Sequence, residues 1–126
     1  MRTLVVEDDF TSRLVLQTFL TRFGECHIAV NGKEAVEAFR TAGAEDRQYD
    51  LICMDIMMPE MDGQEAIRAI RAEKTPGAAS VKIIMTTALG DVASVSRAYQ
   101  GMCDSYLKKP INLAKLTEEM KVLGLV

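Results

Sequence analysis

Residues 50–63 read DLICMDIMMPEMDG, and in this stretch Asp55 directly follows the apolar run 51–54. More apolar residues come immediately after it, so the carboxylate interrupts a segment with the character of a buried strand. A charge at the end of a buried strand costs free energy unless another group pairs with it. The partners of Asp55 must therefore come from parts of the chain that are distant in sequence.

The rest of the chain has the pattern of alternating strands and helices. Short apolar runs predict five strands, and segments of helical period between and after them predict five helices. This order is typical of a doubly wound α/β fold, with a parallel sheet covered by helices on both faces. The strands are expected at 3–6, 26–30, 51–54, 81–86 and 105–107. The helices are expected after Thr11-Ser12 as far as Gly24, from Asn31-Gly32 to Gly43, from Asp62-Gly63 to the Thr75-Pro76-Gly77 loop, at 91–100, and from about Asn112 to Leu123.

Length and composition favour a single globular domain, 1–126. Of the 126 residues, 48% are hydrophobic and 26% are charged, as in ordinary folded domains, so disordered and fibrous classes are excluded.

The net charge of −3 and the absence of a basic block argue against direct nucleic-acid binding. No apolar stretch approaches the ~20 residues that span a bilayer. We expect a cytoplasmic protein without membrane contact.

Polar side chains stand at the ends of four of the five predicted strands. The second strand ends in uncharged residues and is expected at the edge of the sheet. In doubly wound sheets, ligands bind at the carboxyl ends of the strands, so the polar side chains should surround one shallow pocket. They are Glu7, Asp8 and Asp9 after the first strand, Asp55 after the third, Thr86 and Thr87 at the fourth, and Lys108 and Lys109 after the fifth.

Several carboxylates at one place repel each other, and a hard divalent cation relieves that repulsion. Mg²⁺ takes oxygen ligands and keeps several waters, so one or two carboxylates and a backbone carbonyl are enough to hold it. Asp8 and Asp55 are the expected carboxylate ligands, and the Met57 carbonyl is the expected backbone ligand. Asp9 is instead expected to cap the first helix.

Four motifs in this order resemble the receiver domain of two-component response regulators, especially the single-domain chemotaxis type. The resemblance covers residues 2–124 and implies the flavodoxin-like strand order 2-1-3-4-5. The motifs are LVVEDD at 4–9, DLICMDIMMPEMDG at 50–63, MTTA at 85–88 and KKP at 108–110.

The resemblance assigns a role to each site residue. It implies that Asp55 is the phosphoacceptor, that Asp8 binds Mg²⁺ directly, and that Glu7, where many receivers have Asp, reaches the metal through water. It implies that Thr87 and Lys109 contact the phosphoryl group. Lys109 is chosen over Lys108 because the family lysine precedes proline, and Thr87 over Thr86 because a small residue, Ala88, must follow it. A cis Lys109-Pro110 bond is also implied.

The function implied is a switch whose output is binding. A histidine kinase or a histidine phosphotransfer protein would donate the phosphoryl group, and the chain would catalyse only its own phosphorylation and dephosphorylation. Thr87 and Tyr106 would carry the change to the surface formed by the fourth helix, the fifth strand and the fifth helix. No effector domain follows residue 126, so a downstream partner protein is expected unless the chain is a fragment.

Two other functions are compatible with parts of this pattern. A phosphohydrolase of the haloacid-dehalogenase type also uses an aspartyl nucleophile and Mg²⁺, but it needs a second Asp where this chain has Met57. A receiver-like binding module that is never phosphorylated would not need the set Asp8, Asp55, Thr87 and Lys109. The switch is therefore the preferred interpretation.

Overall fold

The computed structural model describes residues 1–56, 58, 61–88 and 102–126. Its centre is a five-stranded parallel sheet of β1 (Thr3–Val6), β2 (Cys26–Ala29), β3 (Leu51–Asp55), β4 (Lys82–Thr87) and β5 (Ser105–Lys108). The strands lie in the order β2-β1-β3-β4-β5, and all four neighbouring pairs are parallel. The predicted fold class and strand order are confirmed, and strand boundaries differ by no more than one residue at either end.

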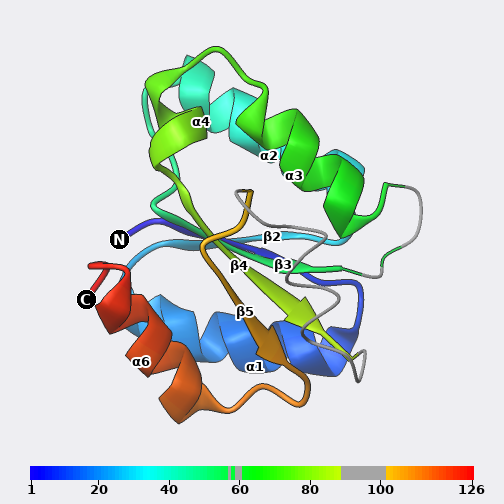
Figure 1. The fold of residues 1–126 in the computed structure, drawn as a ribbon, viewed down its shortest axis with the longest axis vertical. Helices are drawn as coiled ribbons and strands as arrows, with labels where there is room; N and C mark the ends of the chain where they lie inside the picture. The colour runs from blue at the N-terminus through cyan, green and yellow to red at the C-terminus, as the bar shows by residue number, and fades with distance from the viewer. Residues whose placement is uncertain (57, 59–60, 89–101) are drawn as a thin grey trace.

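Helices cover both faces of the sheet (Figure 1). The helices α2 (Gly32–Ala44), α3 (Gly63–Arg71) and α4 (Pro76–Ser80) lie on one side, and α1 (Phe10–Leu20) and α6 (Leu113–Val122) lie on the other. A 3₁₀ turn, Thr21–Phe23, extends α1 towards Gly24. The helix expected at 91–100 falls outside the described residues. None of the helices in the described ranges has both the length and the apolar character needed to cross a membrane.

The short helix α4 occupies a segment that was expected to be a loop, so that expectation was wrong. Pro76 stands in the first turn, where its fixed φ suits a helix and its missing N–H is no loss. Ser80 Oγ donates to the Pro76 carbonyl at 3.2 Å and helps to close the turn. The Thr-Pro-Gly sequence is compatible with a loop and with a helix start, and only the contacts of the folded chain decide between them.

Four of the helices in the described part of the chain begin with a side chain that caps the free backbone N–H groups of the first turn. Asp9 Oδ2 accepts from Ser12 N at 2.8 Å, which confirms its predicted role. Asparagine or aspartate side chains accept in the same way at the starts of α2, α3 and α6. Each of these caps follows the end of a strand, so it fixes the point at which the chain turns away from the pocket edge of the sheet.

The side chains of β3 alternate between two buried layers. Ile52 and Met54 belong to the core beneath α2, α3 and α4, whereas Leu51 and Cys53 belong to the core beneath α1 and α6. All five residues of β3 are buried, which explains its unbroken apolar run. The Cys53 thiol is a core side chain, and burial raises its pKa to about 12.

Arg71, the last residue of α3, connects that helix to α4 and to the residues just before β4 and β5. Its guanidinium donates to the carbonyl oxygens of Ala78 (3.0 Å), Val81 (2.8 Å) and Met102 (2.8 Å), and to Asp104 Oδ2 (3.0 Å). Asp104 Oδ2 also accepts from the backbone at the start of β4. This network fixes the starts of β4 and β5, and hence the register that brings their other ends to the pocket edge.

At the opposite end of α3, Gly63 lies against the backbone that follows β3. Gly63 N donates to the Ile56 carbonyl at 3.0 Å. A Cβ at this position would lie 2.5 Å from the Asp55 carbonyl oxygen and 2.9 Å from Ile56 Cα. The close approach is possible only for glycine, so the start of α3 and the position of Asp55 depend on each other.

We expect Gly63→Ala to destabilise the fold by about 1–3 kcal/mol, the usual cost of forcing an extra carbon into a packed site. Gly43→Ala, in the last turn of α2, is the matched control, because its Cβ would lie 3.3 Å from the flexible Gln48 amide and 4.0 Å from Thr75 Cγ2, an ordinary contact. The control should be neutral or stabilising by up to ~1 kcal/mol. Urea unfolding followed by circular dichroism measures both, and equal midpoints for the two variants would contradict the steric argument.

Candidate functional site

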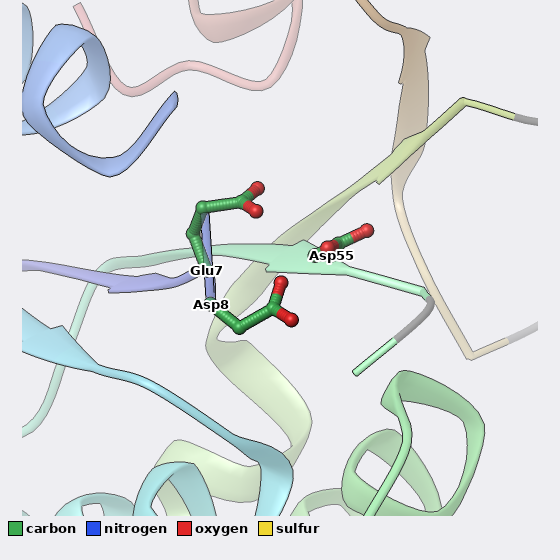
Figure 2. Close-up of side chains that lie close together, drawn as sticks. All are labelled: Glu7, Asp8 and Asp55. Atoms are coloured by element: carbon green, nitrogen blue, oxygen red, sulfur yellow. The ribbon is translucent and has the colours of Figure 1, made fainter. Parts of the chain in front are cut away.

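Three carboxylates meet at the carboxyl edge of the sheet (Figure 2). Glu7 and Asp8 follow β1, and Asp55 ends β3; one oxygen from each lies within 4.8 Å of the others. Glu7 is completely buried, Asp55 is 5% exposed and Asp8 is exposed. The cluster is therefore closed towards the core at Glu7 and open to solvent at Asp8.

The strand register explains why these residues meet. β1 and β3 are neighbours, with Val6 opposite Met54, so the next residues, Glu7 and Asp55, are also opposite each other. Glu7 N continues the ladder on the other side by donating to the Ala29 carbonyl at 3.1 Å. The chain thus places two carboxylates side by side although they are 48 positions apart in the sequence.

Lys109 compensates these charges. Its Nζ lies 2.8 Å from Glu7 Oε2 and 3.3 Å from Asp55 Oδ2. Its backbone N–H donates to the Thr87 carbonyl at 2.7 Å, and its bond to Pro110 is cis, as the family resemblance implied. Lys108 is exposed, so the ammonium that reaches the cluster belongs to Lys109, the lysine that precedes proline.

The electrostatics of the pair follow from burial and mutual attraction. Burial raises the pKa of Glu7, and the charge of Asp55 raises it further, although the hydrogen bond from Lys109 acts in the opposite direction. Burial alone would lower the pKa of Lys109, but its hydrogen bond to Glu7 and the charge of Asp55 outweigh this effect and raise the pKa above its ordinary value. Lys109 is therefore charged at neutral pH.

The two threonines at the end of β4 are both buried, with Thr86 2% and Thr87 0% exposed. Thr86 is in register with Asp55, so the two side chains lie on the same face of the sheet. Because side chains alternate along a strand, the side chain of Thr87 leaves the backbone on the opposite face. The sequence motifs favoured Thr87 over Thr86 and assigned no role to Thr86. Once β3 and β4 are paired, the two-residue period of the strands is the signal that sets Thr86 beside Asp55.

Other predicted residues lie farther from the cluster or outside the described part. Tyr106 is half-buried in β5, in register with Met85, and packs against the core beneath α3. Met57, whose carbonyl was expected to bind the metal, and helix 91–100, which was expected to form part of the output surface, lie outside the described residues.

The donor set suits a hard divalent cation. All three side chains offer carboxylate oxygens, the type of ligand that Mg²⁺ prefers, and Asp8 opens the cluster to solvent for the waters that Mg²⁺ retains. In this structure the ammonium of Lys109 lies against two of the three carboxylates. A bound cation and Lys109 would therefore compete for Glu7 and Asp55.

Comparison with known proteins identifies the family. The family model of the response regulator receiver domain matches residues 3–121. The chain therefore belongs to the response regulator receiver domain family, the regulatory domains of two-component signalling, which interact with histidine kinases and downstream targets. The resemblance seen in the four motifs is confirmed.

Relatives and solved structures agree with this assignment. The chain is 37% identical over 114 residues to the probable transcriptional regulator ycf27 of Cyanidium caldarium, a match covering 90% of this chain and 42% of the relative. It is 35% identical over 124 residues to hybrid signal transduction histidine kinase G of Dictyostelium discoideum, covering 92% of this chain and 3% of that protein. The chain thus spans less than half the length of these curated relatives.

A similar solved structure is the receiver domain of sensor histidine kinase PA1611 from Pseudomonas aeruginosa PAO1, with a magnesium ion coordinated in its active site cleft. It superposes with a TM-score of 0.79 at 31% sequence identity, covering 98% of this chain and 97% of that one.

The raised pKa of Glu7 leads to a pH-dependent prediction. A carboxyl whose pKa rises above its ordinary 4.5 on folding stabilises the fold most below that value, and this contribution is lost as pH rises through the folded-state pKa. Without divalent cations, Glu7→Gln should therefore unfold at a higher urea concentration than the wild type at pH 7, and the difference should shrink towards pH 4. Glu37→Gln, on the exposed side of α2, is the control and should show no such trend. A difference for Glu7→Gln that stays constant with pH would contradict the prediction.

Proposed function

We propose that this chain is a phosphorylation-activated signalling switch that accepts a phosphoryl group on Asp55. The observation that carries the proposal is the meeting of Glu7, Asp8, Asp55 and the Lys109 ammonium at one edge of the sheet, in a chain of the receiver family. The donor would be a histidine kinase or a histidine phosphotransfer protein, and the output a change in binding to a downstream protein.

Asp55 is the nucleophile in this proposal. One of its oxygens attacks phosphorus, the N–P bond of the donor phosphohistidine breaks, and an acyl phosphate forms as the imidazole leaves. Such a transfer depends on positioning and on neutralising the phosphoryl oxygens. Lys109 is already 3.3 Å from Asp55 Oδ2 and supplies one positive charge to that position. Thr87, at the end of the next strand, would contact another phosphoryl oxygen.

Mg²⁺ is the cofactor that we propose. Asp8, Asp55 and the Met57 carbonyl would bind it directly, and Glu7 would bind through a water molecule. When bound, it would supply further positive charge to the phosphoryl oxygens. The magnesium ion in the cleft of the PA1611 receiver domain and the three-carboxylate cluster of this chain support the assignment. Hydrolysis of the acyl phosphate by water would reset the switch, so the chemistry would be limited to the chain's own phosphorylation state.

A protein donor needs a surface beside Asp55, and α1 offers one. This helix begins immediately after the acidic residues that follow β1, and it exposes Phe10 (66%), Leu14 (49%) and Val15 (43%). Three large exposed apolar side chains on one short helix are typical of a surface that contacts another protein. They support docking of the donor close to the acceptor carboxylate.

The output surface is proposed on β5, α6 and the predicted helix at 91–100. Among the described residues, β5 and α6 border a groove of ≈ 690 Å³. Its lining combines the half-buried ring of Tyr106 with charged side chains of both signs, among them Lys108, Lys115 and Glu118. Phosphorylation would move Thr87 and Tyr106 and so alter this groove.

The cytoplasmic location remains a prediction.

The central test is chemical. With Mg²⁺ and a small donor such as acetyl phosphate, the wild-type chain should gain the mass of one phosphoryl group, and Asp55→Asn should abolish that gain because an amide cannot attack phosphorus. Asp46→Asn is the matched control: its φ of 56° lies in the left-handed region that Asn tolerates well, so phosphorylation should be unchanged. A wild-type chain without an adduct in intact-mass spectrometry would favour the silent binding module.

The metal assignment has its own test. Asp8→Asn should weaken Mg²⁺ binding by at least about tenfold, as expected when a ligand carboxylate is lost. Asp9→Asn, one residue further on, should leave binding unchanged, because Asn caps a helix as well as Asp does. Titration of ¹H–¹⁵N amide signals with Mg²⁺ measures both affinities. Equal affinities for the two variants would remove Asp8 from the ligand set.

A further inference from the structure

Thr86 carries a buried hydroxyl that the proposed mechanism does not use. The residue is 2% exposed, and its Oγ1 has no hydrogen-bond partner among the residues that the structure describes. An unpaired buried hydroxyl costs folding free energy, and valine would fill the same space without that cost. Such a group in a packed strand requires an explanation.

The sheet places this hydroxyl on the path of Lys109. Thr86 is in register with Asp55 on one side and with Leu107 on the other, so the three side chains share the face covered by α1 and α6. β4 lies between β5 and β3. Lys109 follows β5, and its ammonium reaches Asp55 at the end of β3, so its side chain extends past the end of β4 towards the face that Asp55 and Thr86 share.

The ammonium needs a further acceptor once a cation binds. It has three N–H donors, and in this structure it contacts Glu7 Oε2 and Asp55 Oδ2. Both carboxylates belong to the acidic cluster (Figure 2), so a divalent cation there would compete for them and repel the ammonium. Lys109 must nevertheless stay beside Asp55 to meet the phosphoryl group.

We propose that Thr86 is a positioning residue for Lys109: its hydroxyl accepts a hydrogen bond from the ammonium when a divalent cation in the acidic cluster competes for Glu7 and Asp55. The hydroxyl has no partner among the described residues, and it would gain one when the cation binds. This inference rests on the metal site of the proposed function, and it adds a residue that stabilises the loaded arrangement without touching metal or phosphorus.

The test compares Thr86→Val, which removes the hydroxyl but keeps the shape, with Thr86→Ser, which keeps the hydroxyl. Thr3→Val is the matched control, because Thr3 is 1% exposed, its hydroxyl also has no partner among the described residues, and it lies at the opposite end of the sheet. Mg²⁺ affinity is measured by NMR titration without any phosphodonor. The ¹H–¹⁵N signal of the Lys109 ammonium, assigned by its loss in Lys109→Arg, is recorded before and after saturation.

Thr86→Val should be at least as stable as the wild type without cation, yet bind Mg²⁺ about tenfold more weakly, the size expected for losing one hydrogen bond to a charged group. The Lys109 signal at saturation should differ from that of the wild type. Thr86→Ser should restore both affinity, within about twofold, and signal, and Thr3→Val should change neither. If Thr86→Val does not fold, the comparison of Thr86→Ser with Thr86→Ala replaces it.

The inference would be overturned if Thr86→Val bound Mg²⁺ as tightly as the wild type does and gave the same Lys109 signal. It would also be overturned if Thr86→Val and Thr86→Ser lost Mg²⁺ affinity equally. Because the titration needs no phosphoryl transfer, its outcome is separate from that of the proposed function. A chain that binds Mg²⁺ with the expected Thr86 dependence but gains no phosphoryl adduct would contradict the switch and leave the role of Thr86 in place.

Discussion

The ammonium of Lys109, held between Glu7 and Asp55, is the interaction on which the pocket edge depends. Two carboxylates lie side by side there, one fully buried and the other nearly so. Without a cation, their repulsion and desolvation would disfavour the register that brings β1 and β3 together. The lysine comes from the far edge of the sheet, so a single side chain connects β5, β3 and β1 across β4. It also marks the place where a metal ion or a phosphoryl group could substitute for one of these charges.

Contacts elsewhere in the fold hold this arrangement in position, both at the opposite end of the sheet and at the start of α3. Arg71 fixes the starts of β4 and β5 through three carbonyl oxygens and Asp104, at the end of the sheet opposite to the pocket. Gly63 lets the start of α3 approach the backbone of Asp55. The charged edge is therefore supported by an ion-paired guanidinium network at the other end of the sheet and by a close backbone contact at Gly63. The polar residues at the pocket edge serve chemistry at some cost in stability. The Thr86 hydroxyl, which has no hydrogen-bond partner within the described ranges, is one such cost.

Much of this could be predicted because local pattern and chemistry agreed. The apolar runs predicted all five strands to within one residue at either end, since a buried parallel strand leaves an unbroken apolar segment. Asp9 was recognisable as a cap from its position alone. The helix at Pro76–Ser80 was missed, because Thr-Pro-Gly is compatible with a loop and with a helix start. The choice of Lys109 over Lys108 came from the proline that follows it, and the geometry of the ammonium agrees with that choice.

The sequence by itself determined the order of the strands and helices along the chain, the family, and the residue types at the strand ends, because these depend on short-range periodicity and on motifs. Only the tertiary structure decided which of those residues share a face. Thr86 and Thr87 are adjacent and chemically identical, and nothing local distinguishes their environments. The pairing of β4 with β3 does so, because side chains alternate along a strand and the register sets Thr86 level with Asp55. The burial of Glu7 and its ion pair with Lys109 arise in the same way, from strands that meet only when the chain has folded.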